Sequence, residues 1–131
     1  IPRGKADLIL SLEPMESLRY LPYLSPEGII VTATEPYLNI ENYPAQEVLL
    51  ETIAATANHL LVNAASVAKE AGSIKSYNVV MLGAAAPYLE IAPEELERAI
   101  EIFFSRKGKE MVELNINAFR LGRANALNEQ K

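Results

Sequence analysis

The chain has 131 residues, of which 50% are hydrophobic and 22% charged, the composition of one folded domain rather than of a disordered segment. Its formal net charge of -5 argues against a nucleic-acid surface, because phosphate binding needs clustered Lys and Arg. It has no cysteine, which excludes disulfides, thiolate nucleophiles and cysteine-ligated zinc or iron–sulfur clusters on this chain.

Further absences bear on metal binding and location. The one histidine, His59, belongs to no HxxxH or carboxylate–histidine pattern, so we expect no metal site, and its place after a helical stretch suits a helix C-terminus. No apolar run approaches the ~20 residues that span a bilayer, so we expect a cytoplasmic protein with no membrane contact. The chain starts at Ile1 without an initiator methionine, and we expect a further segment upstream of it.

The first part of the chain predicts a strand, a short helix and a second strand. Ala6–Leu12 is an apolar run that stops at Glu13, and Pro14 then takes the favoured first position of a helix. Residues 25–28 predict a turn, and Ile29–Ala33 a short β-branched strand. The apolar positions of this helix are Met15, Leu18, Leu21 and Leu24. Pro22 should bend the helix or end it early.

The middle of the chain continues the alternation. A second helix is expected to start at Tyr43-Pro44, a third strand at Leu60–Asn63, and a short helix at Ser66–Ala71, with Gly72 in a left-handed cap. The inward stripe expected for the second helix consists of Val48, Leu49, Thr52, Ile53, Thr56 and Ala57.

The last part of the chain predicts helices. Residues 78–86 could form a buried strand or a buried helix, and the alanine run favours a helix. Pro93 opens an amphipathic helix in which Glu94 and Arg98 form an i,i+4 pair. Its expected inward face is Leu96, Ala99, Ile100 and Phe103. Gly108 ends it, and a final helix should run to about Gly122.

Strands that alternate with helices indicate an α/β fold: a Rossmann-like three-layer arrangement with a mostly parallel sheet and a helical C-terminal end. We expect residues 1–122 to form a single domain and residues 123–131 to be a polar, frayed tail.

Candidate ligand residues follow the predicted strands. Open α/β sheets bind ligands at the carboxyl ends of their strands, where Glu13, Thr32, Thr34 and Asn63 are expected to lie. The competing interpretation is that these side chains cap helices or satisfy turn backbones. Asn78 is either a helix cap or an interface residue. No GxGxxG loop is present to receive a dinucleotide, and no residue is assigned a catalytic role.

Two residue types invite a functional interpretation that the pattern does not require. Glu94, Glu95, Glu97 and Glu101 look like paired carboxylates, but they fall in the first turns of one helix and are expected to form its solvated face. The six tyrosines modestly favour a partner-binding surface, because tyrosine buries apolar area while keeping a polar tip.

The closing segment at 104–122 reads FSRKGKEMVELNINAFRLG, a string that neither composition nor periodicity requires. It resembles the end of the gamma domain of the 2-oxoacid:ferredoxin oxidoreductases, in which a Lys-Gly-Lys/Glu-Glu turn opens a helix with an Asn-x-x-Ala-Phe-x-x-Gly pattern. Residues 6–24, ADLILSLEPMESLRYLPYL, are similar to the form typical of the indolepyruvate-type beta subunit. Further matches follow in chain order at 25–31, 43–44, 68–72, 78–84 and 93–96.

There are departures from the family pattern. The Thr or Ser that usually precedes Pro-Glu-Glu is Ala92, and the usual Val-Asp-Ala after the third strand is Val62-Asn63-Ala64, which removes a carboxylate from the ligand edge. Where members commonly show Asn-Thr, this chain has Ala33-Thr34. The family's opening Gly-x-Gly-Gly-x-Gly segment is absent, which is consistent with a domain that lacks its first βα unit.

The resemblance implies a role in a multi-subunit enzyme. Such an enzyme decarboxylates an aryl or other 2-oxoacid on thiamine diphosphate, passes the acyl group to coenzyme A, and sends electrons through iron–sulfur clusters to ferredoxin. The thiamine and the clusters would reside on a larger partner subunit, and this chain, inactive alone, would act in assembly. The alternatives are a stand-alone α/β module that binds a nucleotide or coenzyme A at its sheet edge, and a dimerisation module; a homo-oligomer stays open.

Overall fold

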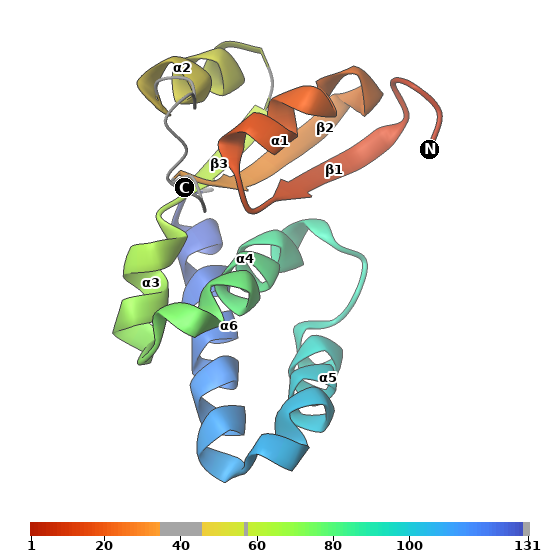
Figure 1. Ribbon diagram of the computed structural model, residues 1–131. Coiled ribbons are helices and arrows are strands. Elements are labelled where there is room, and N and C mark those ends of the chain that lie inside the picture. Colours follow the sequence, from red (N-terminus) through yellow and green to blue (C-terminus); the bar gives the residue numbers. More distant parts are fainter. Residues whose placement is uncertain (35–45, 57, 130–131) are drawn as a thin grey trace. The chain divides into compact units, whose positions relative to one another are not determined.

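The chain separates into a unit that holds the sheet and a unit that is entirely helical (Figure 1). The structure, a computed structural model, describes residues 1–34, 46–56 and 58–129. The two units are Ile1–Asn63 and Ala64–Lys131, and each has its own buried core.

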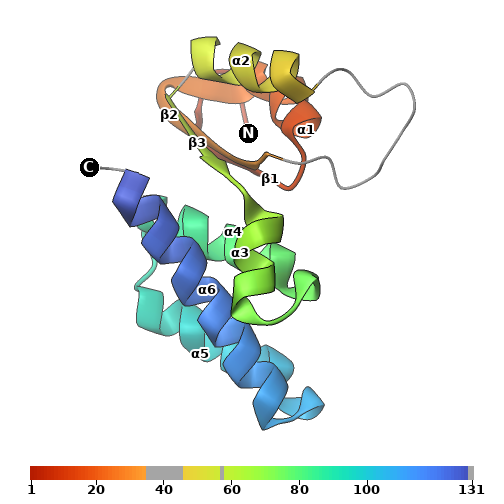
Figure 2. The same ribbon diagram turned by 90° about the vertical axis from the view of Figure 1, so that its left-hand side faces the viewer.

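The first unit is a parallel sheet with two helices on one face (Figure 2). Its strands are β1 (Ala6–Ser11), β2 (Leu24–Ala33) and β3 (Asn58–Val62), paired in the order β1-β2-β3. Its helices are α1 (Pro14–Arg19), the 3-10 turn Leu21–Tyr23, and α2 (Gln46–Thr56). Right-handed crossovers between neighbouring parallel strands place both helices on the same face. There Ile9, Ile30 and Ile53 form a buried cluster.

The start of β2 differs from the sequence prediction. The turn expected at 25–28 is part of β2, because the strand begins at Leu24, which pairs with Ala6, and runs on to Ile29, which pairs with Leu8. The pairing shifts register between Ala6 and Leu8 of β1. Residues 25–28 of β2 lie opposite this shift and form an irregularity in the pairing of the two strands. The expected effect of Pro22 is confirmed, since α1 ends at Arg19 and a 3-10 turn follows.

The expected inward stripe of α2 is correct only in part. Leu49 and Ile53 are buried, but Val48 and Thr52 are exposed, and the Thr52 hydroxyl donates to the Val48 carbonyl. The helix start predicted at Tyr43-Pro44 and the position of Ala57 lie outside the described residues, as does the side chain of Thr56. His59 lies in β3 rather than at a helix end, because that strand starts at Asn58.

Within residues 64–129, the second unit contains four helices. They are α3 (Ala64–Ala71), α4 (Tyr77–Ala85), α5 (Pro93–Phe104) and α6 (Lys109–Glu129), separated by 3-10 turns at Ile74–Ser76, Ala86–Tyr88 and Ser105–Lys107. Residues 78–86 are therefore helical, as the alanine run favours. Gly72 has a φ of 124°, and its N–H and that of Ser73 bond back to α3, so the predicted left-handed cap is confirmed.

Helix α6 continues seven residues past the predicted end. The expectation of a frayed polar tail at 123–131 is wrong for residues 123–129, which are helical and include the fully buried Ala126. The reason is that Gly122 is a packing residue. A Cβ at Gly122 would overlap the Val80 carbonyl of α4, and a Cβ at Gly83 would overlap the Phe119 carbonyl of α6. The two glycines let the helix backbones touch.

The Asn-x-x-Ala-Phe-x-x-Gly pattern thus has a structural explanation. Its four fixed positions are buried on α6, with Ala118 and Phe119 fully so, and Gly122 meets α4. The amide of Asn115 is satisfied within the helix, since its Nδ2 donates to the Met111 carbonyl at 2.9 Å. The pattern encodes the contact between α4 and α6 rather than a ligand site.

The structure confirms the α/β class, the parallel sheet and the helical C-terminal end. Within the first unit the sheet and its helices make two layers, and the single domain expected at 1–122 stays a prediction. Across the described ranges, no helix combines the length and the apolar character that crossing a membrane requires.

Candidate functional site

The carboxyl edge of the sheet in the first unit brings three of the predicted residues to one level. Ser11 pairs with Thr32, and Thr32 with Leu61, across the three strands. Glu13, Thr34 and Asn63 each follow one of these register partners by two residues. Neighbouring strands lie about 4.8 Å apart, and the Thr34 N–H donates to the Val62 carbonyl at 2.9 Å. The three residues therefore form a row along this edge.

Thr32 is buried within the sheet, two residues before Thr34, and does not face solvent. It is fully buried, and its Oγ1 lies 2.7 Å from Ser11 Oγ. The Ser11 hydroxyl lies 2.7 Å from the Glu13 carbonyl and the Thr32 hydroxyl 3.2 Å from the Ala33 carbonyl, so each hydroxyl can donate to the other or to a backbone carbonyl. The two hydroxyls form a relay that holds the backbone at Glu13. For Thr32 this favours the structural interpretation.

Ser11 is the residue that sequence reasoning missed. It is a buried polar residue at the end of β1, directly after the apolar run Leu8–Leu10. The signal was a hydroxyl side chain inside the run Leu-Ile-Leu-Ser-Leu, where an unpaired hydroxyl would be costly. A partner on the neighbouring strand was therefore to be expected, although the sequence alone does not identify Thr32 as that partner.

The side chain of Glu13 is not used to cap α1. Glu13 is the residue before the helix, with extended backbone, and it makes no side-chain capping bond. Pro14 follows and has no N–H to offer. Glu13 is half-buried, as is Thr34, while Asn63 is exposed. The edge thus presents a carboxylate, a hydroxyl and an amide side by side.

The electrostatics of this edge disfavour phosphate. The excess of acidic over basic residues in the chain falls in residues 1–63, whose basic residues are Arg3, Lys5 and Arg19. Arg3 and Lys5 precede β1, at the opposite edge of the sheet, and Arg19 pairs with Glu16 at 3.1 Å. The ion pairs of the described residues do not include Glu13, and a carboxylate favours ligand groups that donate hydrogen bonds, such as amides and hydroxyls.

Asn78 belongs to the second unit, at the second position of α4. Its Oδ1 accepts from the Val79 N–H at 3.0 Å, so it satisfies one of the free N–H groups of the first helical turn. The residue at the N-cap is Ser76. Asn78 is exposed and borders an apolar groove of about 250 Å³ between α4 and α5.

That groove corrects the predicted inward face of α5. Ile100 is buried, at 5% exposure, but Ala99 is exposed and Phe103 is 77% exposed. Leu96 is half-buried. The face is amphipathic as predicted, yet only its centre is buried, because α5 packs mainly against α6 and the rest of the apolar stripe lines the groove beside α4.

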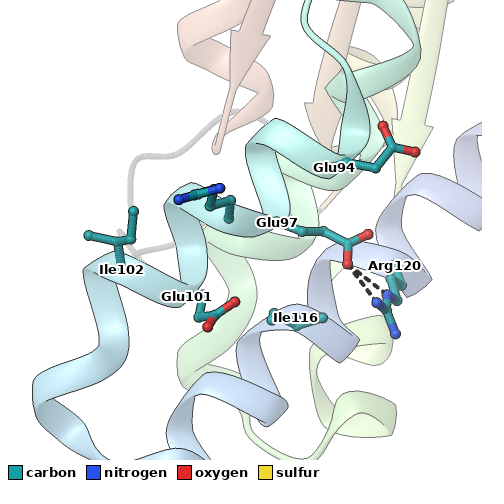
Figure 3. Close-up of a pocket in the computed structure, with 7 residues that line it drawn as sticks. Glu94, Glu97, Glu101, Ile102, Ile116 and Arg120 are labelled. Carbon is teal, nitrogen blue, oxygen red and sulfur yellow. Dashed lines mark hydrogen bonds and ion pairs between the residues drawn. The ribbon is translucent and has the colours of Figure 1, made fainter.

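A second hollow, of about 550 Å³, lies along α5 and α6 and is lined mainly by charged residues (Figure 3). Glu97 points across to Arg120, whose Nε and Nη2 donate to Glu97 Oε1 at 3.0 and 2.6 Å. This hydrogen bond and the carboxylate charge raise the pKa of Arg120. Glu94 and Arg98 are not joined by an ion pair in the described residues, so that prediction is wrong.

The prediction of a fully solvated acidic face is therefore wrong for Glu97, which is partly covered by its partner on α6. Twenty-three positions separate Glu97 from Arg120, and no local pattern indicates such a pair.

Within residues 1–34, 46–56 and 58–129, no three or more His, Asp or Glu side chains lie close enough together to hold a metal ion.

Comparison with known proteins gives consistent results. The model of the family described as pyruvate ferredoxin/flavodoxin oxidoreductase matches residues 1–125. Two similar proteins are named indolepyruvate oxidoreductase subunit IorB: that of Thermococcus kodakarensis is 32% identical over 93% of this chain, and that of Methanothermobacter thermautotrophicus 36% identical over 93%. The chain spans 64% and 65% of the length of these two relatives.

A solved structure shares the fold. It is a 2-oxoglutarate:ferredoxin oxidoreductase from Magnetococcus marinus with 2-oxoglutarate, coenzyme A and succinyl-CoA bound, matched with a TM-score of 0.71 at 22% identity over 98% of this chain and 21% of that chain. The family match covers nearly all of the sequence, including the segments at both ends that carry the resemblance. The chain belongs to the pyruvate ferredoxin/flavodoxin oxidoreductase family.

Proposed function

We propose that this chain is part of a subunit of a thiamine-dependent 2-oxoacid:ferredoxin oxidoreductase, and that it carries no cofactor of its own. The assembled cytoplasmic enzyme would decarboxylate an aryl or other 2-oxoacid and form its acyl-CoA. The observation that carries the proposal is the family match over residues 1–125, and the relatives named as indolepyruvate oxidoreductase subunits support it.

The composition supports this division of labour. A chain without cysteine offers no thiolate for an iron–sulfur cluster, so the clusters, together with thiamine diphosphate, would be held by a larger partner subunit. Ferredoxin would dock on that larger subunit, and coenzyme A would bind close to it. The role left to this chain is assembly and the shaping of the surface around the active site.

The test is to purify the natural protein from its own extract under anaerobic conditions and to identify its partners by native mass spectrometry. We expect a stable complex with a larger, cysteine-rich subunit that contains iron and thiamine diphosphate. The complex should reduce a ferredoxin or viologen acceptor only when a 2-oxoacid and coenzyme A are both present. Recovery of the protein alone, without iron or thiamine, would contradict the proposal.

A second candidate is a module that itself binds coenzyme A through the row of Glu13, Thr34 and Asn63. The observation in its favour is that the register brings these three side chains to one edge. The acidic character of this edge weighs against the phosphate end of the ligand, but the amide-rich pantetheine arm would match it. Titration calorimetry with coenzyme A on the isolated protein decides, because saturable binding that Glu13→Gln weakens would favour this candidate.

A further inference from the structure

The apolar groove of about 250 Å³ in the second unit lies between two helices that are not packed tightly on each other. Helices α4 and α5 both pack against α6, and the connection between them loops outward (Figure 1). The walls of the groove include Leu82 of α4 and Leu96 and Phe103 of α5. Among the described residues that line it, Asn78 alone is polar. The groove is therefore open apolar space at the surface of a helical unit.

The size and the lining of the groove suit side chains of a protein partner and not a cofactor. Small-molecule sites usually enclose about 300 to 1,000 Å³ and combine apolar walls with several convergent polar groups. This groove is smaller, and the Oδ1 of Asn78 already accepts from the Val79 N–H at 3.0 Å. Apolar side chains need no polar groups from the groove, so they match it better than a cofactor does.

Two adjacent phenylalanines give the groove an aromatic end. Phe103 is 77% exposed, and Phe104 is half-buried. Their ring centroids lie 5.0 Å apart with an interplanar angle of 74°, which is the favoured edge-to-face geometry. A ring already held by its neighbour loses little conformational entropy when a partner covers it. Phe103 therefore has the character of an interface hot spot.

The 3-10 turn that follows Phe104 places two cations beside this end of the groove. Arg106 and Lys107 are exposed, and neither forms an ion pair within the described residues. Lys109, which comes just after them, does pair, with Glu113 at 3.9 Å. Unpaired cations next to an apolar surface are complemented by a partner that carries carboxylates next to apolar side chains.

We propose that this groove is the docking site for an amphipathic helix of the larger partner subunit, with apolar residues on one face and carboxylates beside Arg106 and Lys107. Helices form the walls, and their backbone groups are bonded internally, so an extended segment would leave its own N–H and C=O groups unpaired. A helix satisfies its own backbone and lays its apolar face into the groove. The source of the helix rests on the proposed function, and the surface rests on the geometry of α4 and α5.

Cross-linking in the purified natural complex identifies the occupant. A photoreactive benzoylphenylalanine replaces Phe103 in one variant and Ile102 in its matched control. Ile102 is the neighbouring residue and is 66% exposed, but it lines the charged hollow along α6. We expect position 103, and not position 102, to cross-link to a helical segment of the larger subunit that contains Asp or Glu.

The outcomes of this experiment separate the two proposals. A complex in which position 103 cross-links to a second copy of this chain, or to no protein, would overturn the docking site and leave the enzymatic role intact. If the natural protein has no larger partner subunit, both proposals fail.

The affinity between the separately purified full-length subunits gives a second test. Phe103→Ser should weaken binding at least about tenfold, as removal of an interface hot spot does. Ile102→Ser should leave the dissociation constant within about twofold. Both side chains are exposed, so both variants should unfold at the temperature of the unsubstituted protein, which thermal unfolding verifies. Equal affinities of the two variants would refute the groove as the binding surface.

The salt dependence of association tests the acidic character of the occupant. Lys107→Glu should slow association about three- to tenfold at low salt, and the difference should shrink in about 1 M salt. Lys69→Glu is the control, because that exposed lysine lies on α3 and does not line the groove. Equal rates for both variants would exclude carboxylates beside the turn. Binding of this protein to anionic lipid vesicles that Phe103→Ser abolishes would assign the surface to a membrane and overturn the proposal.

Discussion

At the scale of single residues, the hydrogen bonds that link Thr32, Ser11 and the Glu13 carbonyl hold the backbone in place at the carboxyl edge of the sheet. Ser11→Ala removes one donor and leaves the buried Thr32 hydroxyl without its partner on β1. We expect the free energy of unfolding to fall by about 1 to 2 kcal/mol, measured by urea denaturation. Ser105→Ala is the matched control: that hydroxyl also donates to a carbonyl, at 2.9 Å, but in an exposed turn.

The double variant Ser11→Ala with Thr32→Val separates this relay from loss of packing. In Ser11→Ala the Thr32 hydroxyl keeps the Ala33 carbonyl as its acceptor at 3.2 Å, so removing that hydroxyl as well should cost little more, and the double variant should be about as stable as Ser11→Ala alone. If the two single losses simply add, the relay does not couple the strands as the geometry requires.

At the scale of elements, the crossing of α4 and α6 depends on two glycines that have no room for a side chain. In a free helix, Gly→Ala stabilises by about 1 kcal/mol. Here Gly122→Ala should destabilise by about 2 to 3 kcal/mol, because its Cβ would overlap the Val80 carbonyl. Asn128→Ala, on an exposed position of the same helix, should be neutral or slightly stabilising. Thermal unfolding distinguishes the signs, and a gain in Gly122→Ala would exclude the close crossing.

The face of α5 gives a second prediction at this scale. Phe103→Ala should cost less than about 1 kcal/mol, because that side chain is 77% exposed. Ile100→Ala, at 5% exposure, should cost about 2 to 4 kcal/mol. Denaturant midpoints of the two variants measure this order. The reverse order would restore the face that periodicity predicts, with Phe103 packed inside.

These elements show what sequence reasoning can reach and where it stops. Local signals placed the starts of helices, since Pro14 and Pro93 stand at the first helical positions, and Gly72 caps as its lack of a Cβ allows. The errors arose where a distant contact decides. Gly122 looks like a helix end in the sequence but packs against α4, and residues 25–28 look like a turn but lie within β2, between Leu24 and Ile29, which both pair with β1. The ends of the predicted strands were enough to predict the row of side chains at the sheet edge. The role of Ser11 could not be predicted in this way, because it depends on Thr32, which lies 21 residues away.

At the scale of the whole molecule, the charge is distributed unevenly, with the net negative charge in residues 1–63 and the second unit close to neutral. The proposed substrates, a 2-oxoacid and coenzyme A, are both anions. If the carboxyl edge of the sheet faces them in the assembled enzyme, Glu13 repels them. Two charges about 7 Å apart in a water-like medium interact by roughly 0.6 kcal/mol.

Glu13→Gln in the purified complex should therefore lower the KM of an anionic substrate about two- to threefold at low salt. The effect should vanish in about 1 M salt, where screening acts within about 3 Å. Glu16→Gln is the matched control, since that carboxylate lies on α1 and already pairs with Arg19. Steady-state kinetics at two salt concentrations measure both variants. A KM that rises in Glu13→Gln would mean that this carboxylate accepts a hydrogen bond from the substrate, and an unchanged KM would place the edge away from the reaction, leaving this chain a role in assembly alone.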